Sequence, residues 1–316
     1  NISNTIIVFK TVLRILSYAY LCQMSTETLS IDPKTSENAR IYGLLSAAVG
    51  PRPIAFASTL DAEGKPNLAP YSFFNVFSSN PPIVVFSPVR RGRDNTTKHT
   101  LDNILATREV VINMVNYAMV QQMSLASTEY EAGVDEFIKA GFSKAHSEAV
   151  KPFRVKEAPV QLECKVNEVV ALGTEGGSGN LVVCEVLRIH IKKEVLTEAE
   201  TIDEHKIDLV ARMGGNWYTR AIDGMFEVPK PLRNLGVGVD ALPEAVRLST
   251  VLSGNDLGRL GNIAALPDAE AVKVFLAENQ DLKEVVNSGD QERLHQAIKE
   301  LVNQDRTGDA WKLILA

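Results

Sequence analysis

Short apolar runs rich in β-branched and aromatic residues, separated by turn residues, fill the first two thirds of the chain. Such runs predict extended segments over 52–60, 67–77, 83–87, 109–115, 160–172 and 181–191. The last two flank G-T-E-G-G-S-G-N, the clearest hairpin signal in the sequence. This part of the chain is therefore expected to be mainly β.

Helical patterns in the same region are few and short. They predict helices over 101–107, 117–126 and 134–140, the first capped by Thr100 with Asp102 in its first turn. Several strands with so few helices do not make the regular βαβ alternation of a doubly wound fold. The pattern favours a β-barrel with helical decorations.

The pattern changes near residue 228, where E-V-P-K-P-L-R (227–233) indicates a linker. Helical stretches follow over 243–253, 268–278, 280–287 and 290–303. We therefore expect a barrel domain over 24–227 and a helical C-terminal extension over 228–316.

The first 23 residues stand apart from the rest. The chain begins at Asn1, and Lys10 and Arg14 interrupt an apolar run. Its longest uncharged part is far shorter than the roughly 20 residues that a membrane span requires. Met24 then opens a polar segment. We interpret residues 1–23 as a non-native or disordered leader, with a helix on a membrane surface as the alternative.

Composition narrows the functional classes. A formal net charge of −6 and 6% aromatic residues argue against a general nucleic-acid binder, because phosphate affinity requires clustered Lys and Arg. Cys164 and Cys184 lie in apolar runs and are interpreted as small buried hydrophobes, with a reactive thiol as the alternative. No Cys-x-x-Cys pair is present, so no metal site is expected. Sparse, unpaired cysteines favour the cytoplasm.

Three polar segments carry candidate binding chemistry. They are Ser58-Thr59 at a strand end, the run from Asn67 to Asn75, and Ser87 followed by Arg90, Arg91, Arg93, Lys98 and Thr100. Cations beside a helix N-terminus suit the phosphate of flavin mononucleotide, FMN. The irregular Ala69-Pro70 step is expected to leave backbone N–H groups for the flavin carbonyls, and Phe73 and Phe74 to wall the ring. Because an Arg-rich loop alone is usually solvated and a Phe pair usually core, the order of the segments carries the hypothesis.

These segments resemble the flavin reductase-like, FMN-binding split-barrel family. The run from Arg52 to Asn75 is similar to the family's signature. It is continued in register by P-P-I-V-V-F-S (81–87), K-H-T-x-x-N-I (98–104), V-V-I-N-M-V (110–115), A-P-V-Q-L-E-C (158–164), L-R-I-H-I (187–191) and R-M-G-G-N-W-Y (212–218). The resemblance covers roughly 40–220. It implies a split barrel of the pyridoxamine-phosphate-oxidase type that forms a homodimer, with the flavin near the subunit interface.

By this resemblance, ten residues are expected to contact the flavin. They are Ser58, Thr59, Asn67, Ala69, Ser72, Phe73, Ser87, Arg91, Lys98 and Thr100. The loop 90–94 is less regular than the other motifs, so Arg91 is the loosest of these assignments. The family usually shows Lys-Asp-Thr where this chain has Lys98-His99-Thr100, which leaves the role of His99 open.

The activity implied by the resemblance is an NAD(P)H-dependent FMN reductase, with delivery of reduced flavin to a monooxygenase as a further role. The alternatives are a flavoredoxin-like electron carrier with tightly held FMN and a non-catalytic FMN-binding module. No catalytic acid or base stands out, because the protein mainly holds and tunes the two rings. His190 is interpreted as structural, with an approach to the nicotinamide as the alternative. Trp217 and Tyr218 either line the pocket or pack.

The helical extension carries no recognisable chemistry. Leu294, Ile298 and Leu301 lie at helical spacing and need an apolar partner. We expect that partner to be the barrel of the same subunit or of its dimer mate, with a docking surface for a monooxygenase as the alternative.

Overall fold

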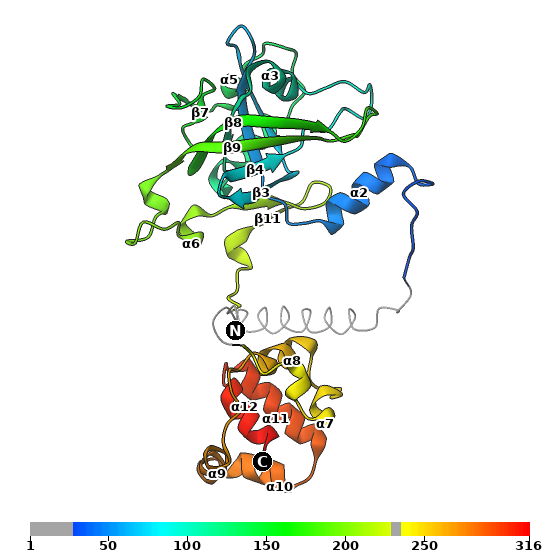
Figure 1. Cartoon of the computed structure of the whole chain (residues 1–316), viewed down its shortest axis with the longest axis vertical. Coiled ribbons are helices and arrows are strands. Elements are labelled where there is room, and N and C mark those ends of the chain that lie inside the picture. Colours follow the sequence, from blue (N-terminus) through cyan, green and yellow to red (C-terminus); the bar gives the residue numbers. More distant parts are fainter. Residues whose placement is uncertain (1–27, 229–234) are drawn as a thin grey trace, which may run out of the picture. The chain divides into compact units, whose positions relative to one another are not determined.

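The computed structural model describes residues 28–228 and 235–316 (Figure 1). The predicted leader over 1–23 and most of the predicted linker lie outside these residues. The contacts between residues divide the chain into two compact units, and the boundary along the sequence falls between Met225 and Phe226.

The first unit is built on one antiparallel seven-stranded sheet in the order β2-β1-β5-β8-β9-β4-β3. The strands are β1 (Ala55–Leu60), β2 (Pro66–Tyr71), β3 (Phe74–Ser79), β4 (Pro82–Phe86), β5 (Glu109–Asn113), β8 (Val160–Ala171) and β9 (Asn180–Ile191). Two-stranded ribbons add β6 (Lys144–Ala145) with β7 (Arg154–Val155) and β10 (Val210–Arg212) with β11 (Tyr218–Arg220).

The sheet curls because its two edges are joined by a two-residue link. Only Ser72 and Phe73 separate β2 from β3, yet these strands lie at opposite ends of the sheet order. A flat sheet of seven strands is about 29 Å wide at roughly 4.8 Å per strand. Three peptide steps reach about 11 Å at most. The edges must therefore approach each other, which produces the expected barrel.

In the described part of this unit, five α-helices surround the barrel: α2 (Asn38–Ala48), α3 (His99–Thr107), α4 (Val120–Leu125), α5 (Glu136–Ala140) and α6 (Glu204–Ile207). Side chains alternate between the two faces of β1, so Ala55 and Ala57 point into the barrel core. Ile104 of α3 packs in the same core. Phe56 points the other way and packs with Phe137 of α5. Both faces of β1 are therefore buried, and the polar Ser58 and Thr59 of this strand are buried together with its apolar residues.

Both described cysteines lie in the barrel core. Cys164 and Cys184 are fully buried and unbonded to each other. Burial raises the pKa of the Cys184 thiol to about 12. Their interpretation as small buried hydrophobes is confirmed.

The structure corrects four local predictions in this unit. The extended segment over 67–77 is two strands, because the chain crosses from one sheet edge to the other at Ser72. No helix was expected before residue 101, whereas α2 begins at Asn38. The cap of α3 is Lys98 and not Thr100, which lies in the first turn. The Ala69-Pro70 step is also regular: β2 pairs with β1 along its whole length, with Ala69 opposite Ala57.

The second unit is helical. It contains α7 (Glu244–Arg247), α8 (Gly254–Gly261), α9 (Ala269–Glu278), α10 (Gln280–Asn287), α11 (Gln291–Asn303) and α12 (Thr307–Ile314). The helix predicted over 243–253 is only the short α7, and α8 and α12 were not predicted. No helix in the described parts of the chain is long and apolar enough to cross a membrane.

The apolar residues of α11 pack inside the second unit itself. Ile298 and Leu301 are buried in a core centred on Trp311, and Leu294 packs against that core. The Trp311 indole N–H donates a 2.7 Å hydrogen bond to the carbonyl of Leu260. The expectation that these leucine and isoleucine side chains need the barrel as their partner was therefore wrong, because the extension folds around a core of its own.

Candidate functional site

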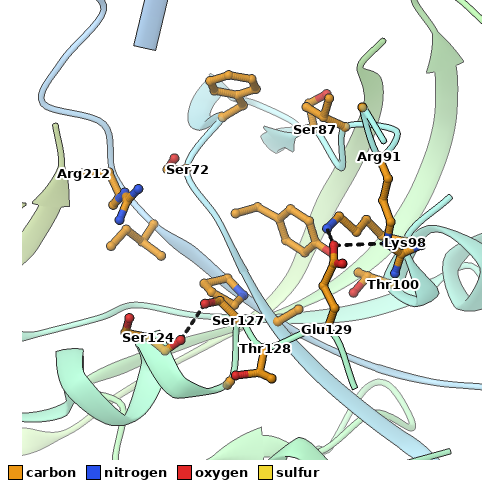
Figure 2. Close-up of a pocket in the computed structure, with 18 of the residues that line it drawn as sticks. Ser72, Ser87, Arg91, Lys98, Thr100, Ser124, Ser127, Thr128, Glu129 and Arg212 are labelled. Carbon is orange, nitrogen blue, oxygen red and sulfur yellow. Dashed lines mark hydrogen bonds and ion pairs between the residues drawn. The ribbon is translucent and has the colours of Figure 1, made fainter. Parts of the chain in front are cut away.

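A pocket of about 990 Å³ opens beside the link between β2 and β3 (Figure 2). Its walls come from β2, the loop after β4, the start of α3, the segment between α4 and α5, and residues from α2 and β10–β11. Eight of the ten predicted contact residues line it: Asn67, Ala69, Ser72, Phe73, Ser87, Arg91, Lys98 and Thr100. The fold thus gathers two of the three predicted segments into one cavity, the run from Asn67 and the run from Ser87 to Thr100.

Ser58 and Thr59 do not line this pocket. Both are fully buried in β1. The Thr59 hydroxyl accepts a 3.0 Å hydrogen bond from the side-chain amide of Asn103 in α3. Thr59 therefore supports the pocket from behind by joining β1 to α3. Phe74 packs against the barrel core instead of walling the pocket, whereas its neighbour Phe73 lines it.

The floor of the pocket is a buried polar contact. The Asn67 side-chain amide donates to the Thr100 hydroxyl at 2.8 Å, which joins β2 to the first turn of α3. Ser87 supports the neighbouring wall, because its hydroxyl accepts a 3.0 Å hydrogen bond from the backbone N–H of Asn180 at the start of β9.

The Arg-rich loop after β4 is held by the glycine-rich hairpin loop between β8 and β9. The Arg90 N–H donates to the Ser178 carbonyl at 2.9 Å, and the Gly177 N–H donates back to the Arg90 carbonyl at 3.0 Å. A Cβ at Gly176 would lie 3.1 Å from the Arg91 carbonyl oxygen, closer than ordinary packing allows. Glycine at this position therefore lets the two loops touch, which fixes the Arg91 backbone at the pocket wall.

Three cations of this wall converge on one carboxylate. Glu129 lies between α4 and α5 and accepts from Lys98 at 3.0 Å, from Arg91 at 3.2 Å and from Arg93 at 2.9 Å. The hydrogen bond from Lys98, together with the Lys98 charge, holds the pKa of the Glu129 carboxyl below its ordinary value. The wall thus has the charge that suits an anion, and it lies beside the N-terminus of α3, where the helix dipole also favours negative charge.

A second cationic region faces the first across the pocket. Figure 2 shows Arg212 and Ser72 on the side opposite Arg91 and Lys98. The Arg212 guanidinium stacks 4.7 Å from the ring centroid of Tyr218 and donates to the Gly215 carbonyl at 2.8 Å. Arg212 has no ion-pair partner among the residues the structure describes. Both ends of the pocket therefore present positive charge.

Sequence reasoning missed several residues of the site. Glu129, Glu136 and Arg212 line the pocket, and so do Ser127 and Thr128. Glu136 is almost fully buried, its carboxylate accepts the Leu68 N–H at 3.1 Å, and burial raises its pKa. Arg212 opens the motif R-M-G-G-N-W-Y (212–218), but no sequence signal placed the loop between α4 and α5 against Lys98. Of the two undecided aromatic residues, Tyr218 lines the pocket, whereas Trp217 is exposed outside it.

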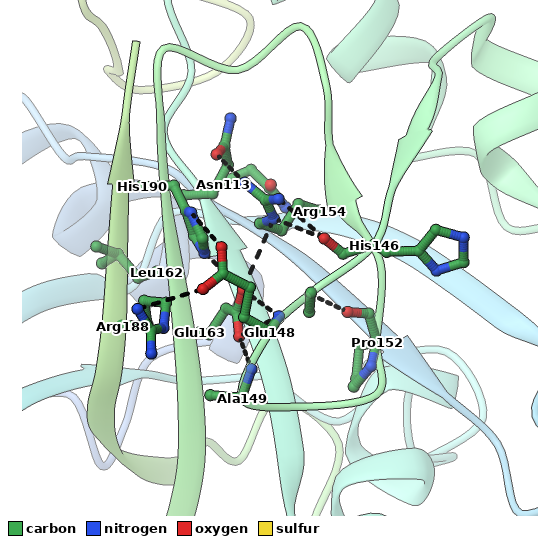
Figure 3. Close-up of polar contacts among 12 residues, drawn as sticks. Asn113, His146, Glu148, Ala149, Pro152, Arg154, Leu162, Glu163, Arg188 and His190 are labelled. Atoms are coloured by element: carbon green, nitrogen blue, oxygen red, sulfur yellow. Dashed lines mark hydrogen bonds and ion pairs between the residues drawn. The ribbon is translucent and has the colours of Figure 1, made fainter. Parts of the chain in front are cut away.

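A separate polar cluster surrounds the other end of β8 and β9 (Figure 3). The Glu163 carboxylate is fully buried and lies 2.6 Å from the His190 Nε2. It also accepts the backbone N–H groups of Glu148, at 2.9 Å, and Ala149, at 2.5 Å. His190 is not part of the pocket lining, so its contacts agree with the structural interpretation.

No group of three or more His, Cys, Asp or Glu side chains within 28–228 and 235–316 is arranged to hold a metal ion. The described part of the pocket presents two cationic regions, an aromatic wall, and the polar side chains of Asn67, Ser87 and Thr100.

The antiparallel split barrel and its cationic pocket together indicate the class of protein. The family model for the flavin reductase like domain matches residues 49–209 of this chain. An uncharacterized protein of Aquifex aeolicus is 36% identical over 188 residues, which cover 60% of this chain and 93% of that protein. YwrF, an uncharacterized protein of Bacillus subtilis, is 30% identical over 182 residues, covering 57% and 88%. The chain belongs to the flavin reductase-like family, as its motifs predicted.

Solved structures agree with this assignment. Component B of nitrilotriacetate monooxygenase from Bacillus cereus matches with a TM-score of 0.61 at 27% identity, covering 65% of this chain and all of that one. The 2-nitrobenzoate 2-nitroreductase of Pseudomonas fluorescens matches with a TM-score of 0.57 at 28% identity, covering 66% of this chain and all of that one. The split-barrel fold predicted for the first unit is confirmed.

Proposed function

We propose that this protein is an NAD(P)H-dependent FMN reductase. The observation that carries the proposal is the convergence of Arg91 and Lys98 at the start of α3, at one end of a pocket of about 990 Å³. Such a set of donors suits a terminal phosphate. The volume lies at the upper end of the roughly 300–1,000 Å³ that small-molecule sites span.

The residues present fit FMN. Arg91, Lys98 and the Thr100 hydroxyl would hold the phosphate, and Phe73 supplies an apolar wall for the ring. Bound FMN supplies the hydride acceptor, so the chain needs no nucleophile of its own. The chain must orient two flat rings in one cavity. Such orientation removes much of the free-energy barrier to a bimolecular step.

The electron donor is the finer part of the proposal. NADH and NADPH carry a pyrophosphate, and Arg212 stacked on Tyr218 offers a cation and an aromatic face at the other end of the pocket. This arrangement favours a dinucleotide donor over an uncharged one. Delivery of reduced flavin to a monooxygenase is supported by the similarity to component B of nitrilotriacetate monooxygenase. A flavoredoxin-like carrier and a non-catalytic FMN-binding module remain the alternative functions.

A homodimer is part of the same proposal. β3 is an edge strand, and its Val76 and Phe77 side chains are about two-thirds exposed. Exposed apolar edges of this kind are normally covered. A two-fold interface over this edge would cover both copies at once. Light scattering over a range of concentrations tests it, and a monomer with full FMN occupancy would contradict it.

The central experiment is anaerobic reduction. The purified protein is loaded with FMN, and NADH and NADPH are added separately while absorbance near the flavin maximum is followed. Rapid bleaching by one donor, with many turnovers when free FMN is in excess, is the expected result. Binding of FMN without reduction by either donor would favour the non-catalytic module. Reduction limited to one bound equivalent would favour the electron carrier.

A further inference from the structure

Glu129 occupies the position that an anionic ligand would take. Its carboxylate is surrounded by Lys98, Arg91 and Arg93 at 2.9–3.2 Å, the spacing of charge-assisted hydrogen bonds to a phosphate. Figure 2 shows the Glu129 side chain reaching from its loop toward Lys98 and Arg91. Two of these three cations lie in the loop after β4 and Lys98 caps α3, so the group is assembled from two segments.

The fold does not depend on the contacts between Glu129 and these three cations in the way that it would depend on an ion pair in the core. Glu129 is 40% exposed and Arg93 is 72% exposed, so water can solvate both when they separate. The Arg91 guanidinium keeps other partners, since it donates to the Thr96 hydroxyl at 2.9 Å and to the Thr97 carbonyl. Opening the Glu129 contacts therefore leaves Arg91 in place at the pocket wall.

We infer that Glu129 is a built-in competitor of the flavin phosphate and determines how readily the protein exchanges its flavin. This inference rests on the proposed function. A phosphate can take the three cations only if the Glu129 carboxylate leaves them, so FMN binding must offset the lost contacts. A flavin without a phosphate leaves Glu129 undisturbed. Glu129 thus weakens FMN selectively and returns to its cations when FMN departs.

This arrangement assigns FMN the role of an exchangeable ligand. Affinity differences between closely related complexes lie mostly in the dissociation rate. A carboxylate that replaces the departing phosphate lowers the cost of leaving the less exposed cations, Arg91 and Lys98, without an anion. The inference favours a reductase that releases its flavin over a carrier that retains it.

The test compares FMN with riboflavin on three proteins. Wild type, Glu129→Gln and Glu131→Gln are titrated at low ionic strength, with flavin fluorescence as the readout. Glu131 is an exposed acid on the same loop that neither lines the pocket nor forms an ion pair in the described residues, which makes it a matched control. We expect Glu129→Gln to bind FMN about five- to tenfold more tightly and to release it correspondingly more slowly. Riboflavin affinity should change less than about twofold, and Glu131→Gln should match wild type for both flavins.

Two further measurements keep the test decisive. Glu129→Ala should reproduce the selective gain, and riboflavin binding by each variant reports that its pocket is intact. In a Lys98→Ala background the effect of Glu129→Gln on FMN should shrink, because the two residues are coupled. Equal tightening of FMN and riboflavin, or no tightening of FMN while riboflavin still binds, would overturn the inference. Wild-type protein that binds neither flavin would instead refute the proposed function.

Discussion

The Asn67 side chain donates a 2.8 Å hydrogen bond to the Thr100 hydroxyl across the floor of the pocket. Both residues are buried, and they belong to an edge strand and to the first turn of a helix. The contact therefore joins the start of α3, with its cations, to the strand that leads into the Ser72–Phe73 link at the pocket.

Thr100→Val removes this contact at nearly constant volume. The buried Asn67 side-chain amide then loses its nearer acceptor. The Thr59 hydroxyl, 3.4 Å from the amide nitrogen, remains as its acceptor. We expect a loss of about 1–3 kcal/mol in the free energy of unfolding, together with weaker FMN binding, measured by urea denaturation and flavin titration. Thr174→Val, in the exposed hairpin loop, is the control and should leave both quantities unchanged. Wild-type stability in Thr100→Val would mean that the contact contributes nothing.

Lys98→Ala tests the phosphate site directly. Loss of one charge-assisted contact is expected to cost roughly 1.5–3 kcal/mol, so FMN should bind about tenfold more weakly or worse. Riboflavin, which has no phosphate, should bind as it does to wild type. Lys193→Ala removes an exposed lysine far from the pocket lining and serves as the control. An unchanged FMN affinity, or riboflavin binding as tight as FMN in wild type, would contradict this assignment of the phosphate end.

The Glu163 cluster predicts a dependence of stability on pH. Burial by itself raises the pKa of the Glu163 carboxyl, but hydrogen bonds from the Glu148 and Ala149 backbone and from His190 outweigh it, so the net pKa is lowered. An acid whose pKa is lower when folded contributes stability above its unfolded value, near 4.5, and loses that contribution as the pH falls. Glu163→Gln should therefore cost about 2 kcal/mol or more at pH 7, and less in acid.

Denaturant unfolding at several values between pH 7 and pH 4 measures this difference. Glu168→Gln, an exposed acid on the same strand, should give a small difference at every pH. A cost of Glu163→Gln that stays constant down to pH 4 would show that the buried charge contributes nothing to stability.

Trp311→Ala tests whether the two units fold independently of each other. Its indole is fully buried in the second core, so truncation should destabilise that unit by about 3–5 kcal/mol. The flavin pocket is built from the first unit, so FMN affinity should stay within about twofold. The chain has two tryptophans, of which Trp217 is exposed. Trp217→Phe leaves Trp311 as the only tryptophan, so its fluorescence follows the unfolding of the second unit in protein that keeps Trp311. A large loss of FMN affinity in Trp311→Ala would show that the two units fold as one.

The sequence by itself determined five of the seven strands of the sheet, the hairpin between 160–172 and 181–191, the two-part division and the family. Local periodicity, turn residues and the linear order of motifs carry that information. It also placed Lys98 and Arg91 in the site, because cations near a helix start have a local signature.

Only the tertiary structure decided which side chains meet. The chain crosses from one sheet edge to the other at Ser72, and barrel closure alone brings that link beside the start of α3. Thr59 faces Asn103 and not the pocket, because β1 is covered on both faces. Glu129 reaches Lys98 across 31 positions of sequence through the packing of α4 and α5 on the barrel. Such contacts depend on how distant elements pack, and no local pattern of residue types encodes that packing.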